Sequence, residues 1–209
     1  MVKLFVCSSC KKIYYCSRAC QKKNWNHHKH ICAEQKALNQ IFDGLSLLSP
    51  LAAQRQKHWF EWRQCIDERP YVNALRLHKD CGQARTHLII EESVYTPDAD
   101  RRFTVVRCGV FRIHEALTEI ERIMRLKPGG GAEACSHSLK RQPQDGPQSI
   151  AFIVFRFSEG VAPWLDRRTI DAEDLEQMPY NPKWRQDINK DHPPAKLILS
   201  EDLKDAEFD

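Results

Sequence analysis

Cysteines and a histidine at metal-ligand spacing gather at the start of the chain. Five of the nine cysteines fall within the first 32 residues, and this clustering indicates a metal site more strongly than their number does. Thiolates and imidazoles are the ligands that tetrahedral zinc prefers in proteins. A two-residue gap lets one tight turn aim two sulfurs at one ion, and a three-residue gap on a helix places two ligands on one face. The sequence predicts zinc binding by Cys7, Cys10, Cys16, Cys20, His28 and Cys32.

The order and spacing of these ligands resemble a MYND-type zinc finger. The motif Tyr-Cys-Ser-x-x-Cys-Gln-x-x-x-Trp-x-x-His-x-x-x-Cys runs from Tyr15 to Cys32, and the pair Cys7-x-x-Cys10 precedes it. That family binds two zinc ions through interleaved ligand pairs, so the resemblance implies one complete site with four ligands, Cys7, Cys10, His28 and Cys32. Cys16 and Cys20 would be half of a second site, because this chain has no cysteine before position 7.

A rival ligand set has the same residue types. Cys16, Cys20, His28 and Cys32 could form a single site in the order C-x3-C-x7-H-x3-C, and spacing alone does not choose between the two sets. The neighbouring His27 and His30 do not fit the family spacing, and we expect them to be solvated on the same short helix. The resemblance covers residues 1–32.

The same resemblance implies a partner. MYND fingers generally recognise short proline-containing segments of other proteins, and Ser8, Gln21 and Trp25 occupy the positions that line the groove in related fingers. An indole ring suits a proline ring, and Gln and Ser side chains can pair with the backbone of an extended peptide. The alternatives are that Trp25 packs under the metal site and that Gln21 is only solvated.

Charge divides the chain into a basic start and a slightly acidic remainder. The first 36 residues hold eight Lys or Arg against one acid, whereas the remaining residues have a net charge of −3. This asymmetry permits contact with an acidic partner or with nucleic acid. The bases are scattered, however, and the 17 residues between Cys10 and His28 exceed the roughly 12 of a DNA-reading ββα finger. Nucleic-acid binding is therefore the less favoured alternative.

The chain offers no membrane-spanning or export signal. No apolar run approaches the roughly 18 residues that a membrane span needs, and the first apolar run is too short for a secretory signal. Reduced cysteines suit a reducing compartment, so we expect an intracellular protein, nuclear or cytoplasmic.

The remaining residues predict an α+β domain behind the finger. We expect three parts, residues 1–32 as the finger, 33–82 as a helical segment and 83–209 as the α+β body. In the helical segment the patterns indicate a helix that ends at Ser49-Pro50 and a second helix that carries Trp59 and Trp62. In the body they indicate a hairpin of Thr86–Thr96 with Phe103–Ile113 and a helix over Glu115–Lys127. A mobile loop over 128–149 and a buried strand over Ser149–Phe157 follow. Beyond Pro163 we expect polar chain anchored by Trp164 and Trp184.

No catalytic motif appears in that body. There is no G-x-S-x-G elbow, and Gly129-Gly130-Gly131 lacks the Gly-Lys-Ser/Thr of a phosphate loop. The four later cysteines stand alone. We therefore expect no enzymatic activity.

Overall fold

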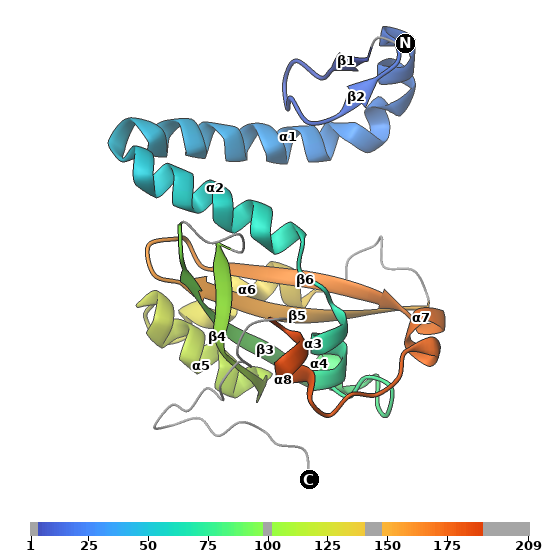
Figure 1. Ribbon diagram of the computed structural model, residues 1–209, viewed down its shortest axis with the longest axis vertical. Coiled ribbons are helices and arrows are strands. Elements are labelled where there is room, and N and C mark those ends of the chain that lie inside the picture. The colour runs from blue at the N-terminus through green and yellow to red at the C-terminus, as the bar shows by residue number, and fades with distance from the viewer. Residues whose placement is uncertain (1–3, 98–101, 141–147, 190–209) are drawn as a thin grey trace. The chain divides into compact units, whose positions relative to one another are not determined.

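The computed structural model describes residues 4–97, 102–140 and 148–189, and it divides into two compact units. The first unit is Met1–His58 and the second is Trp59–Asp209 (Figure 1). The three-part division of the sequence, with boundaries after residues 32 and 82, stays a prediction. Within the described residues, no helix combines the length and the apolar character needed to cross a membrane.

The first unit consists of a small hairpin and a long helix. Strands β1 (Phe5–Val6) and β2 (Tyr14–Tyr15) pair antiparallel, and α1 (Arg18–Leu48) follows. The side chain of Ser17 caps α1 by accepting a hydrogen bond from the backbone N–H of Cys20 at 3.2 Å. The helix ends at Ser49, as predicted, because α2 (Pro50–Gln64) begins with a proline, which has no N–H to donate.

The apolar spacing in the second half of α1 does not create a buried face. Ile41 and Leu48 are 61% and 86% exposed. The buried hydrophobic cluster of this unit instead comprises Cys7, Cys10, Tyr15 and Cys32, with Ile13 packed against it. The interior of the first unit is therefore built largely from candidate metal ligands.

A four-stranded mixed sheet organises the second unit. Its order is β4-β3-β5-β6, formed by β3 (His87–Tyr95), β4 (Phe103–Arg112), β5 (Ser149–Ser158) and β6 (Trp164–Asp171). Strands β3 and β4 form the predicted antiparallel hairpin, and β5 lies parallel to β3 and antiparallel to β6. Both the hairpin and the central buried strand confirm the sequence prediction.

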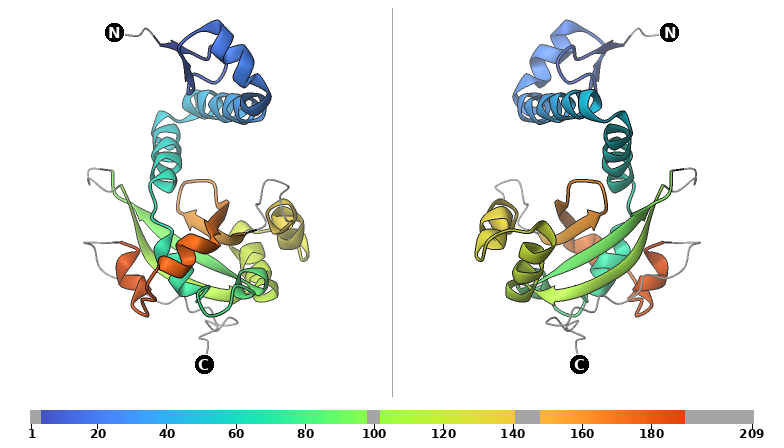
Figure 2. Two further views of the ribbon diagram at one scale, coloured as in Figure 1. Left: turned by 90° about the vertical axis from the view of Figure 1, so that its right-hand side faces the viewer. Right: turned by 90° about the vertical axis from the view of Figure 1, so that its left-hand side faces the viewer.

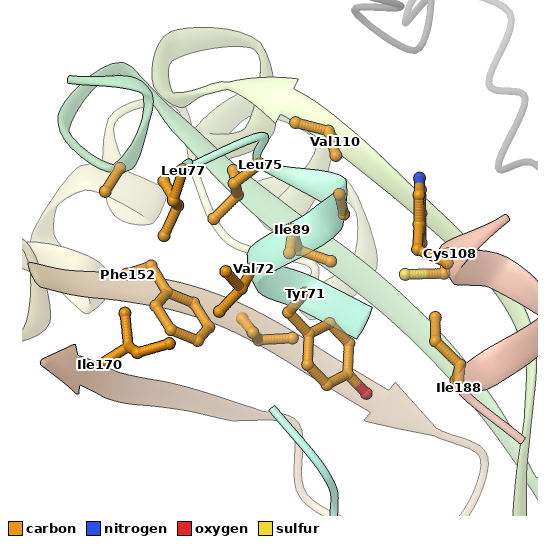
Figure 3. Packing of buried hydrophobic residues seen from close by; sticks show 14 of the residues in the cluster. Tyr71, Val72, Leu75, Leu77, Ile89, Cys108, Val110, Phe152, Ile170 and Ile188 are labelled. Atoms are coloured by element: carbon orange, nitrogen blue, oxygen red, sulfur yellow. The ribbon is translucent and has the colours of Figure 1, made fainter. Parts of the chain in front are cut away.

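Helices pack on both faces of this sheet (Figure 2). Along β3, Ile89 belongs to one apolar cluster, whereas Leu88 and Ile90 belong to the other. Residues of α3 (Arg69–Ala74), α4 (Gln83–Thr86), α7 (Ala172–Gln177) and α8 (Trp184–Asp187) share the first cluster (Figure 3). Residues of α5 (Ile113–Met124) and α6 (Gly130–Leu139) share the second. The α+β fold class is confirmed.

Two expectations for this unit are wrong. Residues 130–139 form helix α6 where a loop over 128–149 was expected, although 141–147 lie outside the described residues. The carboxylate of Glu121 on α5 accepts hydrogen bonds from the N–H groups of Gly129 and Gly131, at 2.8 and 3.0 Å, which anchors the start of α6. Beyond Pro163, where the sequence predicts only polar chain anchored by Trp164 and Trp184, the chain forms β6, α7 and α8.

Candidate metal centre and its exposed face

Four candidate ligands converge in the first unit. One donor atom from each of Cys7, Cys10, His28 and Cys32 lies within 4.8 Å of every other, and all four residues are buried. The sulfurs of Cys7 and Cys32 are 3.8 Å apart, and His28 Nε2 is 3.4 and 3.6 Å from the sulfurs of Cys7 and Cys10. A zinc tetrahedron with ordinary bond lengths has S–S edges of about 3.8 Å and S–N edges of about 3.6 Å. The donor set fits zinc, which would supply the cross-link that holds the finger together.

The first ligand pair is held by a tight turn. The N–H of Lys11 donates to the carbonyl of Cys7 at 2.9 Å, and Lys11 has a left-handed backbone with φ of 55°. The turn points the backbone N–H of Cys10 at the Cys7 sulfur. The hydrogen bond between them is the main reason that the pKa of Cys7 is lowered to about 6. The thiolate that zinc requires is therefore favoured by the backbone.

The second ligand pair lies on α1, one helical turn apart. The ring of His28 is flanked by Tyr15 and Trp25, with ring centroids at 5.9 and 5.8 Å. One turn beyond Cys32, Gln35 donates to the side chain of Asn39 at 3.0 Å, and Asn39 donates to the carbonyl of Cys10 at 3.4 Å. These two amides tie α1 to the first ligand turn. Sequence reasoning missed them, because a polar residue on a helix carries no signal of its partner.

Cys16 and Cys20 lie outside this centre. Their sulfurs are 2.7 Å apart and both residues are exposed. His28 and Cys32 are joined to Cys7 and Cys10 instead, so the rival set of Cys16, Cys20, His28 and Cys32 is wrong. The hydrogen bond from Cys16 is the largest cause that lowers the pKa of Cys20.

The three predicted peptide-binding residues are accessible in the structure. Ser8 is exposed in the turn between the first two ligands, and Gln21 is half-buried near the start of α1. Trp25 follows Gln21 by one helical turn and is 46% exposed, although its ring touches that of His28. His27, as predicted, is exposed.

The second unit contains a buried cluster of charged side chains. Arg156, fully buried, donates to Glu91 and to Asp166, both at 2.8 Å, and the hydroxyl of Tyr71 donates to Glu91 at 2.5 Å. Arg63 of α2 donates to the same Asp166. Burial raises the pKa of Glu91, while Arg156 opposes that shift. The charges of this cluster pair with one another in the interior, as buried ions must, although the buried Nη1 of Arg63 has no hydrogen-bond partner among the described residues.

Two open pockets of about 330 Å³ each lie on the second unit and share Arg69 and Met178. Their lining is rich in carboxylates, and among the described residues neither pocket is lined by a histidine or a cysteine. None of the residues predicted for the site belongs to them.

Comparison with known proteins assigns the finger. Residues 1–32 match the MYND finger family, a family of protein-interaction modules. The chain is 49% identical over 41 residues to mouse Tudor domain-containing protein 1, which is 19% of this chain and 4% of that protein. It is 58% identical over 26 residues to the Drosophila melanogaster Zinc finger MYND domain-containing protein 10 homolog, 12% of this chain and 6% of that protein. No solved structure matches the chain.

The family match defines the class of residues 1–32. Residues 1–32 are a MYND-type zinc finger whose metal centre is Cys7, Cys10, His28 and Cys32. The chain spans only a small fraction of the length of these relatives.

Proposed function

We propose that this protein is a non-enzymatic adaptor whose finger binds short proline-containing segments of partner proteins across Ser8, Gln21 and Trp25. The observation that carries the proposal is the position of Trp25. Its indole is 46% exposed while one side of it rests on the ring of His28, a metal ligand. A half-exposed indole is a suitable surface for a proline ring, because the compact apolar proline ring can pack on the flat apolar face of the indole.

The binding residues would act in different ways. Trp25 supplies the apolar contact, and aromatic anchors dominate the energy of small interfaces. Gln21 and Ser8 supply polar groups for the backbone of an extended peptide, which has no internal hydrogen bonds of its own. Since the surface is small, we expect affinity on the order of micromolar or weaker.

The thiol ligands also bear on location. Zinc-binding thiolates must stay reduced, so we propose that the protein works in a reducing intracellular compartment, the nucleus or the cytoplasm. Nucleic-acid binding remains the less favoured function.

Substitution of Trp25 tests the adaptor proposal. Trp25→Ala should remove most of the binding of a proline-containing peptide to the zinc-loaded protein, whereas Gln21→Ala should weaken it less. Isothermal titration calorimetry measures the affinity, and elemental analysis measures the zinc content of each variant. Tyr14→Ala is the matched control, because Tyr14 is another exposed aromatic side chain of the finger, at 62%.

The zinc content of the Trp25→Ala protein shows whether the Trp25 side chain binds peptide or supports the metal centre. If the variant releases zinc or unfolds the finger, the indole is a structural element that packs on His28, and the groove proposal fails.

A further inference from the structure

One face of α1 carries an exposed row of cations around Trp25. On a helix of 3.6 residues per turn, steps of four, seven, eleven and eighteen residues return to the same side, within a band about 60° wide. Between Arg18 and Lys36, five exposed residues occupy that band, and we call them the basic stripe: Arg18, Lys22, Trp25, Lys29 and Lys36.

The charges of the basic stripe are unopposed within the part of the chain that the structure describes. None of its four cations forms an ion pair with a described carboxylate. The first turn of α1 contains no acidic residue, so the positive pole of the helix adds to the charge of Arg18. The next charged residue on the band is Asp43, which ends the cationic run.

We propose that the basic stripe binds acidic residues that flank the proline in the partner segment, which makes the preferred ligand an acidic, proline-containing peptide. This inference rests on the proposed function. A proline on Trp25 would leave the residues before and after it beside Lys22 and Lys29.

The dimensions suit an extended peptide. Arg18 and Lys29 are separated by eleven residues, or about 16 Å along the helix axis. An extended chain covers that distance in about five residues at about 3.3 Å each. A short segment with acids on both sides of a proline therefore matches the part of the stripe from Arg18 to Lys29 in length as well as in charge.

The stripe favours a peptide over a single-stranded nucleic acid. Proteins that bind single strands stack successive bases on successive aromatic side chains. Trp25 is the one aromatic residue among the five of the stripe, so it offers one stacking position beside four cations.

A pair of probe peptides tests the proposal on the zinc-loaded full chain. One has a proline core flanked by glutamates, and the other has the same core flanked by glutamines. We expect the glutamate peptide to bind about ten-fold more tightly or better at low salt, since each exposed ion pair contributes a factor of roughly 1.5 to 5. Raising the salt from about 0.1 M to about 1 M shortens the screening length from about 10 Å to about 3 Å and should remove most of the difference.

Neighbouring lysines provide the matched variants. Lys22→Gln should reduce the preference for the glutamate peptide by roughly 1.5- to 5-fold, and Lys22→Gln/Lys29→Gln should reduce it further. Lys23→Gln removes the same charge from the other side of α1 and should leave the preference nearly unchanged. None of these variants should alter binding of the glutamine peptide or the zinc content.

The outcomes separate this inference from the adaptor proposal. If neither peptide binds, or binding survives Trp25→Ala, the proposed function fails. If both peptides bind equally and Trp25→Ala abolishes the binding of both, the adaptor proposal stands and the proposed role of the basic stripe is overturned. If oligoglutamate without proline, or a short DNA duplex, competes as well as the acidic proline peptide, the stripe is a general polyanion surface and the inference is overturned too.

Discussion

Single residues determine which thiols of the finger are protected. Cys7, Cys10 and Cys32 are buried in the metal centre, at 3% exposure or less, while Cys16 and Cys20 lie outside it. The same spacing that suggests six ligands therefore gives two chemically different groups of cysteine. Accessibility to a thiol reagent distinguishes them directly.

In the zinc-loaded protein we expect Cys16 and Cys20 to be alkylated by iodoacetamide before the three cysteines of the metal centre. Their exposure leaves the sulfurs open, and no zinc bond consumes their lone pairs in a half-complete site. Peptide mass spectrometry at successive times measures the order of labelling. Equal protection of all five finger cysteines would contradict this expectation and indicate a second, fully ligated metal.

The buried ion cluster of the second unit gives a prediction about stability. Arg156→Met should destabilise the second unit by about 3–5 kcal/mol, because it leaves Glu91 and Asp166 without their shared cation in the interior. Arg107→Met is the control, since Arg107 is half-exposed and pairs with Glu92 near the surface, where about 1 kcal/mol or less is expected. Urea unfolding followed by circular dichroism measures both. Similar losses for the two variants would show that Arg156 has no special role.

At the scale of elements, two glycines on different helices differ in what a side chain would meet. A Cβ on Gly131 would lie 2.4 Å from the backbone oxygen of Leu117 and 2.9 Å from Glu121, so α6 approaches α5 through the bare backbone of this residue. A Cβ on Gly44, within α1, meets nothing within 4 Å.

These two sites predict opposite effects of the same substitution. Gly131→Ala should destabilise the second unit by roughly 1–3 kcal/mol through overpacking. Gly44→Ala should stabilise α1 by up to about 1 kcal/mol, because alanine has the higher helix propensity. Thermal unfolding followed by circular dichroism measures the direction of each change. A stabilised Gly131→Ala protein would mean that α6 does not pack on α5 as described.

The elements that the sequence predicts best are those with an uninterrupted apolar pattern. The hairpin of β3 and β4 and the central strand β5 follow from β-branched and aromatic runs. Strand β6 was missed because Asp166 and Arg168 interrupt its pattern, and they do so as members of the buried ion cluster. Helix α6 was missed because Gly130 and Gly131 open it, and only the contact with α5 explains why they are there.

The sequence predicted the ligands of the metal centre, but it did not predict the contacts that hold them in place. Spacing identified all four ligands, but the choice of Cys7 and Cys10 over Cys16 and Cys20 came from family resemblance rather than from spacing. The continuity of α1 from Arg18 to Leu48, and the amides of Gln35 and Asn39 that bind it to the ligand turn, required the structure.

At the scale of the whole molecule, the two units have different kinds of interior. The second unit has two apolar clusters, one on each face of its sheet, and its described residues contain no candidate metal site. The first unit buries the metal ligands. The two units should therefore respond separately to removal of zinc.

We expect a strong chelator to unfold residues 4–32 of the finger and to leave the second unit folded. Backbone amide NMR spectra before and after chelation measure the response residue by residue, and re-addition of zinc is the control for reversibility. Elemental analysis of the untreated chain should give about one zinc. Two zinc ions that survive mild chelation, or loss of the signals of the β3–β5 sheet, would contradict this picture.

A finger whose interior consists of metal ligands has a stability that depends on its surroundings. For such a unit, each tenfold rise in free zinc above the dissociation constant adds about 1.4 kcal/mol to folding, whereas an apolar core has no such term. The fraction of molecules able to present Trp25 and the basic stripe would then follow the zinc buffering of the cell. Because Cys7, Cys10, His28 and Cys32 form the interior of the finger, zinc availability would also control the proposed partner binding.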